Sequence, residues 1–477
     1  METIAQAVSR MVRQTSIVRS LLLAAIVNCW CGPSVGQDSI AGLLSGDQSQ
    51  AGKADLAADT MGPGVETSAL PQLIEPSVEQ APIDLDALLQ PNTASTSAAG
   101  FRTEAFDGNS LNQADNNFTS FPDFSGGIVI LGENAALKIG GFIKADFITD
   151  FDPIDSEDSF DTTQIPIGAA DYENARFHAK QSRLSFDTRW RVNREVARAY
   201  IESDFFGGND GENGSLRLRH AYGTLGRFTV GQTWTTFTDS SAVPQTLDFE
   251  GAVSNVNRRQ GLMRFTQPLG DSDWKWAVSV EDPTIDIDIP VNLAGQGRTE
   301  SPDIISHLRF DGEFAETQAA FLVRKIGFQP AGQPVLTGTG WGVNLTGSVH
   351  LTECTRVYSQ LTVGEGIGSY RGSPDVVSTG PNSAAILPMF GWMIGCKHSW
   401  TDCLTSNMTF SQLTLEDLPG QEATNLRRTD YLAVNLIYSP YQRLFGGLEY
   451  LYGLRENHNR QQADAHRLQM SFGFYLP

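Results

Sequence analysis

The chain has 477 residues, of which 55 are Asp or Glu and 34 are Lys or Arg, so its formal net charge is -21. So acidic a chain is unsuited to nucleic acid, which binds basic surfaces. Although 40% of the residues are hydrophobic, no run beyond the N-terminal region is long and apolar enough for a membrane-spanning helix. The remaining classes are a soluble all-β protein and a transmembrane barrel, whose strands alternate in polarity.

The first 36 residues have the features of a secretory signal peptide. Arg10, Arg13 and Arg19 precede the apolar run 21–27, and Ser34-Val35-Gly36 forms a cleavage site of the small-x-small type before Gln37. A buried helix that happens to follow arginines would not explain the cleavage site. We therefore predict that residues 1–36 are a signal peptide and that the protein is exported.

Residues 37–125 differ in composition from the rest of the chain. They are acidic, small and polar, with few aromatic residues and with Lys53 and Arg102 as their basic residues. Such a segment buries too little apolar area to offset the conformational entropy lost on folding. We predict a low-complexity periplasmic extension that is largely disordered.

An alternation of polarity begins near residue 136 and continues to the end of the chain. Between Leu137 and Phe147 apolar residues take one parity, while Lys138, Lys144 and Asp146 take the other, as in a strand with one apolar face. There are about sixteen such runs, an even number as single-chain bacterial barrels require. The other runs are 182–190, 196–206, 216–225, 228–234, 261–267, 274–281, 304–311, 316–323, 340–351, 355–364, 388–400, 404–414, 430–438, 443–453 and 465–476.

The connections between these runs also follow the pattern of an outer-membrane barrel. Short joints such as Gly226-Arg227 alternate with long ones at 150–175, 282–303 and 415–429. We therefore predict that residues 126–477 form an all-β transmembrane antiparallel barrel of about sixteen strands in the bacterial outer membrane. A soluble β-sandwich would account for the last strand but not for an exported chain with this many strands. The acidic first long loop lacks the spacing of a calcium-binding loop, so we expect it to be external and solvated.

Strand parity predicts which side chains face the lumen, because positions that face lipid must be apolar. Arg217 and Arg219 lie between outward Leu216 and Leu218. The same reasoning gives His220 a lipid-facing position. The inward basic residues form a stripe on adjacent strands, a common means of selecting ions by charge. This predicted basic wall consists of Lys144, Arg183, Arg198, Arg217, Arg219 and Arg264.

The segment from Thr235 to Gly251 is a long connection between two predicted strands, and loops of this length are usually functional. It combines apolar residues with carboxylates. The apolar residues are Phe237, Val243, Leu247 and Phe249, and the carboxylates are Asp239, Asp248 and Glu250. We predict that this constriction loop folds into the lumen, where its apolar residues are buried and its carboxylates face the basic wall.

Several segments resemble the DcaP-like outer-membrane porins. They are residues 140–147, 201–207, 216–223, 231–237 and 244–249, so the resemblance covers about 136–267. It implies a sixteen-stranded trimeric barrel, an inward third loop and uptake of small anions such as dicarboxylates. It further implies that Arg183, Arg198, Arg217, Arg219 and Arg264 are constriction residues opposite Asp248 and Glu250. Members of this family carry a periplasmic coiled-coil extension, whereas residues 37–125 show no sustained heptads.

From these observations we expect an outer-membrane diffusion porin for small polar, preferentially anionic solutes, with outer-membrane lipid and further copies of the chain as partners. We expect no enzymatic activity, because no Ser/His/acid set can be assembled at one rim. We expect no cofactor and no metal, since Cys354, Cys396 and Cys403 have no zinc-site spacing. Cys354 and Cys403 could pair if their turns are neighbours. The alternative function is an adhesin or receptor that binds through external loops and has a blocked lumen.

Overall fold

The computed structural model describes residues 128–131, 135–209, 211, 213–290 and 292–476. The predicted signal peptide (1–36) and periplasmic extension (37–125) lie outside the described residues.

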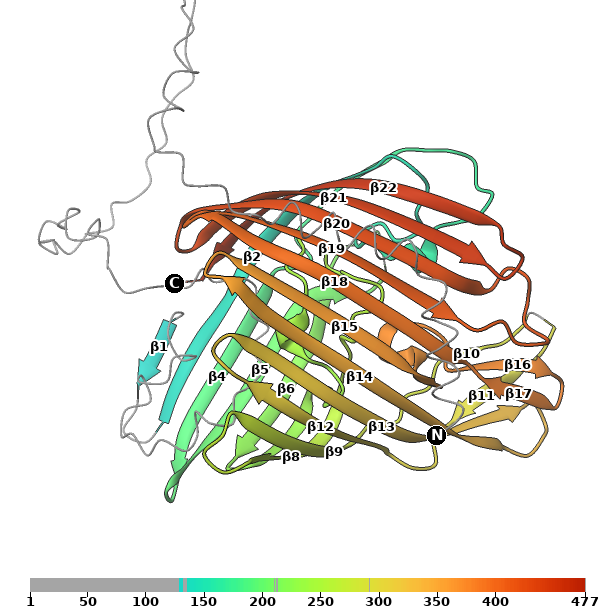
Figure 1. Ribbon diagram of the computed structural model, residues 1–477, viewed down its shortest axis with the longest axis horizontal. Coiled ribbons are helices and arrows are strands. Elements are labelled where there is room, and N and C mark those ends of the chain that lie inside the picture. Colours follow the sequence, from blue (N-terminus) through green and yellow to red (C-terminus); the bar gives the residue numbers. More distant parts are fainter. Residues whose placement is uncertain (1–127, 132–134, 210, 212, 291, 477) are drawn as a thin grey trace, which may run out of the picture. The chain divides into compact units, whose positions relative to one another are not determined.

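Within the described residues, sixteen long strands form a closed antiparallel barrel, which confirms the predicted fold (Figure 1). Every consecutive pair of wall strands is hydrogen-bonded in antiparallel register, and β3 (Asn174–His178) continues the second strand beyond a break at 179–182. The wall strands are β2 (Ala135–Asp150), β4 (Arg183–Val192), β5 (Glu195–Gly207), β6 (Ser215–Leu225), β7 (Phe228–Trp234), β8 (Arg259–Pro268), β9 (Trp274–Glu281), β12 (Asp303–Asp311), β13 (Ala315–Pro330), β14 (Leu336–Thr352), β15 (Thr355–Glu365), β18 (Pro388–Thr401), β19 (Leu404–Leu415), β20 (Leu426–Tyr441), β21 (Leu444–Asn457) and β22 (Gln462–Tyr475).

The barrel closes where the first wall strand meets the last. β2 pairs with β22 from Phe142 to Asp150, and with β4 and β3 on its other side. The short strand β1 (Ile128–Leu131) pairs with β2 at 136–139, where β22 does not reach. Closure pairs the first wall strand with the last, so that neither remains a free sheet edge, where unpaired backbone groups would be costly in lipid.

The outer wall of the barrel is apolar. Ile143, Leu184, Leu216 and Met263 are all exposed on it, as the predicted parity requires. Exposed aromatic residues gather beside the short turns, in the manner of an interfacial girdle; they include Phe228, Trp274, Phe314, Trp400 and Tyr441. Among the described residues, no helix is long and apolar enough to cross a bilayer.

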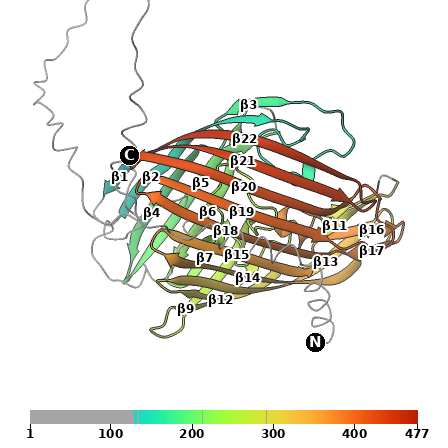
Figure 2. The same cartoon turned by 45° about the horizontal axis from the view of Figure 1, so that its top comes forward.

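Short turns and long loops lie at opposite ends of the barrel, as the sequence predicts. Loops 282–302 and 366–387 supply the small sheet β10 (Ile287–Asp288), β16 (Val376–Gly380) and β17 (Ser383–Ile386). The strand β11 (Gly295–Arg298) pairs in antiparallel register with the loop end of β13. Figures 1 and 2 place these elements at the end opposite β1. Cys354 and Cys403 lie in short turns of successive hairpins. Both are free thiols, so the pairing that the sequence allowed between them is not formed.

A hydrophobic core fills part of the lumen, where parity alone predicted polar residues. Three long loops, 151–173, 235–258 and 366–387, fold inward and pack against the walls formed by β12–β15 and β18–β22. The buried loop residues include Phe160, Ile165, Phe237, Val253, Ile367 and Tyr370, and the wall residues beneath them include Met393, Leu413, Tyr431 and Leu451. The space that remains for solutes therefore lies toward the opposite wall, formed by β4–β8.

Candidate pore constriction

The constriction loop, predicted as 235–251, lies inside the lumen as predicted, and the structure extends it to residues 235–258. It is fixed at its start by Asp239. This carboxylate caps the short helix η6 (Ser240–Ala242), accepting from the Ser241 backbone N–H at 2.9 Å. It also forms an ion pair with Arg309 of β12 and accepts a hydrogen bond from Thr346 of β14. Asp239 is thereby neutralised and buried, with an exposed fraction of 1%.

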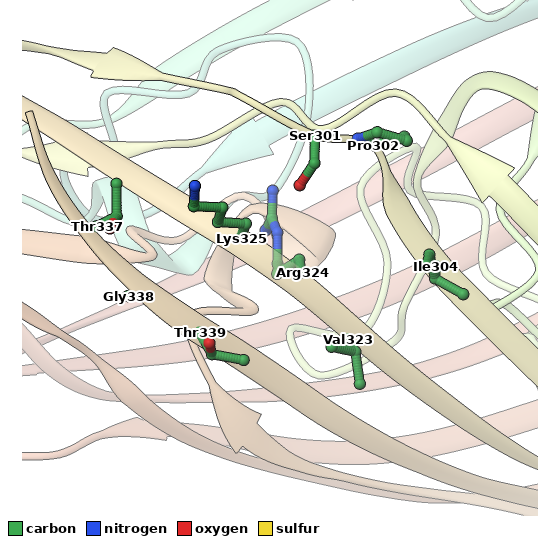
Figure 3. Close-up of a pocket in the computed structure, with 9 residues that line it drawn as sticks. All are labelled: Ser301, Pro302, Ile304, Val323, Arg324, Lys325, Thr337, Gly338 and Thr339. Carbon is green, nitrogen blue, oxygen red and sulfur yellow. The ribbon is translucent and has the colours of Figure 1, made fainter.

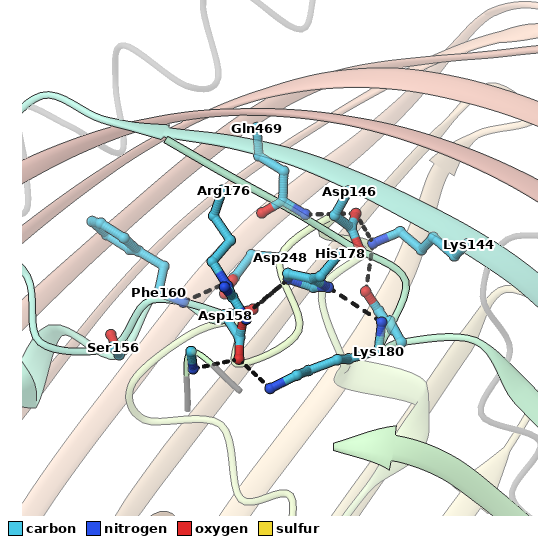
Figure 4. Close-up of polar contacts among 12 residues, drawn as sticks. Lys144, Asp146, Ser156, Asp158, Phe160, Arg176, His178, Lys180, Asp248 and Gln469 are labelled. Atoms are coloured by element: carbon cyan, nitrogen blue, oxygen red, sulfur yellow. Dashed lines mark hydrogen bonds and ion pairs between the residues drawn. The ribbon is translucent and has the colours of Figure 1, made fainter. Parts of the chain in front are cut away.

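The middle of the constriction loop is held by Glu449 on β21. Its carboxylate accepts from the backbone N–H of Leu247 at 2.9 Å and of Asp248 at 2.7 Å. On the other side of the peptide, the Leu247 carbonyl accepts from Lys144 Nζ at 2.6 Å and from Gln469 Nε2 at 3.0 Å. Lys144 is wholly buried and paired with Asp146 at 2.7 Å (Figure 4). The structure thus places Lys144, predicted for the basic wall, beneath the loop and away from the open lumen.

The two remaining carboxylates of the constriction loop contact other loops. Asp248 accepts from the backbone N–H of Phe160 at 2.8 Å and of Gly251 at 2.9 Å, and burial raises the pKa of its carboxyl above the ordinary value. Glu250 pairs with Arg371 of the loop 366–387 at 2.5 Å, and a quarter of its side chain, 25%, stays exposed. Of the three predicted carboxylates, Glu250 is thus the one that reaches solvent.

The first long loop is not the solvated external segment that its acidity suggested. Asp158 is buried and forms ion pairs with Arg176 and Lys180, while Phe160 is buried in the core of the lumen (Figure 4). The expectation was wrong because it weighed the charge of this loop and ignored its apolar residues Ile154, Phe160 and Ile165.

The wall that faces the constriction loop carries a compact group of arginines on β4, β6 and β8. This arginine cluster consists of Arg183, Arg217, Arg219 and Arg259, with Glu202 and Asp204 of β5 between them. Arg219 bridges both carboxylates, at 2.6 Å to Glu202 and 2.9 Å to Asp204. Arg217 binds Asp204 through two nitrogens, at 3.0 and 2.7 Å, and 35% of its side chain is exposed. Four guanidinium groups against two carboxylates leave a positive surplus.

A β-bulge builds this cluster and explains why the sequence misplaced His220. The register shifts between Glu202 and Ser203, so that Glu202 faces His220 and Ser203 faces Leu218. Arg219 is the extra residue, and parity reverses after it. His220 is therefore buried beside Thr233 rather than exposed to lipid, which corrects the predicted position.

Sequence analysis missed Arg259, which opens β8 directly after the constriction loop. Its guanidinium lies 4.5 Å from the centre of the Trp234 ring and within electrostatic reach of Arg183, Arg217 and Arg219. Among the described residues it has no carboxylate partner in an ion pair. Its position at the end of the inward loop was the one feature of the sequence that could have indicated a role in the pore. Alternation of polarity could not predict which way its side chain faces, because Arg259 is the first residue of its strand.

The two other predicted wall arginines lie apart from the cluster. Arg198 is buried and shares Asp187 with Arg189, nearer the short turns. Arg264 lies on β8 at the register of Thr229 and Ser279, within electrostatic reach of Glu281. The structure therefore brings together Arg183, Arg217 and Arg219 from the predicted wall.

One surface cavity of the barrel lies away from the arginine cluster. A cavity of about 320 Å³ lies at the loop ends of β12, β13 and β14, where Lys325, Ile304 and Val323 line it (Figure 3). Ile304 and Val323 are exposed on the outer wall, so this cavity opens outward and not into the lumen. In the part of the chain that the structure describes, no group of His, Cys, Asp and Glu is arranged to hold a metal ion.

Comparisons with known proteins agree with this architecture. Residues 107–475 match the model of the DcaP outer membrane protein family. The outer membrane channel DcaP of Acinetobacter baumannii is 23% identical with a TM-score of 0.66, over 73% of this chain and 99% of that chain. An anion-selective porin from Comamonas acidovorans is 9% identical with a TM-score of 0.50, over 72% of this chain and 100% of that one. A search of curated proteins finds no match.

Proposed function

The chain belongs to the DcaP outer membrane protein family and is an outer-membrane channel, and from that premise we propose that it passes small polar solutes with a preference for anions. Dicarboxylates are the class that the arginine cluster suits best. A guanidinium group binds a carboxylate through two parallel hydrogen bonds, and neighbouring arginines offer a second carboxylate the same geometry.

The observation that carries this proposal is the positive surplus of the arginine cluster beside the passage. Arg217 is the most exposed of the residues paired there, and Arg259 has no ion-pair partner among the described residues. The opposing loop adds little negative field, because Asp239 is paired with Arg309 and Glu250 with Arg371. A permeating ion senses nearby charges far more than those beyond a Debye length of about 8 Å at physiological salt. The acidic total of the chain therefore does not decide the selectivity.

We also propose that the channel is a homotrimer in the outer membrane. This proposal rests on the family resemblance of residues 136–267. The arginine cluster does not depend on it, because all four arginines belong to a single chain.

One observation favours a second candidate, a receptor whose lumen is blocked. Loops 151–173, 235–258 and 366–387 fold inward and bury a hydrophobic core, so that much of the lumen is filled. The arginine cluster still favours a passage, since a guanidinium group without a carboxylate partner, such as that of Arg259, would be costly to bury beside a dry, closed space.

Conductance distinguishes the two candidates. The purified full chain, inserted in a planar lipid bilayer, should produce discrete conductance steps with stable open levels. Barrels that are folded, as judged by heat-modifiable migration in a gel, and that are incorporated in the bilayer yet remain electrically silent would contradict the channel and favour the receptor.

A further inference from the structure

Phe249 of the constriction loop crosses to the wall that carries the arginine cluster. Its ring stacks on Phe206 of β5, with the ring centres 4.0 Å apart and the planes inclined by 24°. The Arg217 guanidinium lies over both rings, 5.0 Å from the centre of Phe249 and 5.3 Å from that of Phe206. This stack links the constriction loop to the wall that carries the arginine cluster.

The backbone that carries Phe249 has little freedom to move. Asp248 receives a hydrogen bond at its carboxylate and donates one to Glu449 from its backbone, and Glu250 pairs with Arg371. The residues before and after Phe249 are therefore both held in place, which fixes the position of the ring. Phe206 is fixed as well, since it lies in β5 and its ring meets the His178 ring edge-on at 5.9 Å.

Phe249 has no partner in the hydrophobic core of the lumen that would explain its position. The core buries Phe237, Ala252 and Val253 of the same loop, whereas Phe249 is only partly buried and turns the other way. A partly buried aromatic ring beside Arg217 and Arg219 occupies space that water and solutes would otherwise fill.

We propose that Phe249 determines the size limit of the pore, while the arginine cluster determines its charge preference. The inference rests on the proposed channel function and deepens it, because it assigns the two properties to different side chains. The Phe249 ring narrows the passage between loop and wall, and Phe206 is the surface against which it closes. Removal of the ring enlarges the passage but leaves the ion pair between Arg217 and Asp204 in place.

A series of substitutions at this position tests the inference in planar bilayers. Phe249→Ala should raise the single-channel conductance roughly 1.5-fold, and Phe249→Trp should lower it, because pore diameter limits conduction. Phe249→Ala should also admit larger neutral polymers to the pore, while the anion preference stays as in the wild type. Phe205→Ala is the matched control, since it removes a phenylalanine ring next to Phe206 that faces lipid instead of the lumen, and it should leave the conductance unchanged.

The outcomes separate this inference from the proposed function. A silent wild type would overturn the channel itself. A conducting wild type whose conductance and polymer cutoff are the same in Phe249→Ala would overturn the role of Phe249 alone. If the ring merely anchored the loop, Phe249→Ala and Phe249→Trp would both give noisy openings of variable size, without the opposite signs expected here, and that result would also overturn the inference.

Discussion

Replacement of Arg217 and Arg219 by alanine should abolish the anion preference of the pore. The arginine cluster then keeps Arg183 and Arg259 against Glu202 and Asp204, so that its positive surplus disappears. The charge of Asp204 is the least compensated in this variant, because both of its guanidinium partners are removed. The measurement is the reversal potential across a bilayer with a KCl gradient, and the effect should shrink at high salt because ions screen the wall charges.

The opposite pair of substitutions should move the selectivity the other way. Glu202→Gln with Asp204→Asn keeps the shapes of the side chains but leaves the four guanidinium groups without counter-charges, so the anion preference should increase. The control for the removal of Arg217 and Arg219 is Arg227→Ala with Arg443→Ala, which removes two arginines from exposed short turns outside the lumen. Equal effects from these two arginine pairs would mean that total charge, and not the arginine cluster, sets the selectivity.

Deletion of residues 244–251 from the constriction loop should increase the single-channel conductance on the order of 2-fold or more, because the part of the loop that narrows the lumen is then absent. This segment contains Leu247 and Phe249, whose contacts hold the loop across the lumen. The barrel should remain intact, since the ladder between neighbouring wall strands includes none of these residues.

The shortened chain should therefore keep its heat-modifiable migration and its β-rich circular dichroism spectrum. Glu449 and Lys144 lose their loop partners, but in a wider lumen water replaces them. A deletion variant that folds and conducts like the wild type would contradict the placement of the narrowest point at this loop. Asn457→Ala in the wall, away from the loop, provides a control for the effect of substitution as such.

The sequence predicted the barrel well because lipid imposes a simple rule on it. Each wall strand must present apolar residues outward, so alternation such as that of Leu216 to Arg219 determines both the strand and its two faces. The inward position of the constriction loop was also predictable, because Phe237 and Leu247 would have had no apolar partners outside. Both predictions depend only on whether each residue faces lipid, water or an apolar core. The polarity of the individual residues in a single sequence indicates this.

The details of the site depend on contacts that alternation does not record. The bulge at Arg219 changes the parity by one residue, and nothing in the run from Leu216 to Tyr222 marks it. Lys144 and Asp248 have the right charge for a pore wall, yet the packing of the loop over β2 and β22 buries them. The hydrophobic core of the lumen was missed for a related reason, since Met393 and Leu413 face inward beneath loops whose path the sequence leaves open.

The most direct test of the central claim is the reversal potential of the wild-type channel in a bilayer under a KCl gradient. If the arginine cluster acts as the filter, the sign should be that of chloride permeating more readily than potassium, and it should persist at low salt despite the acidic total of the chain. A reversal potential with the sign of a cation-selective pore would contradict the account, because the carboxylates of the lumen would then outweigh the arginines beside the constriction loop.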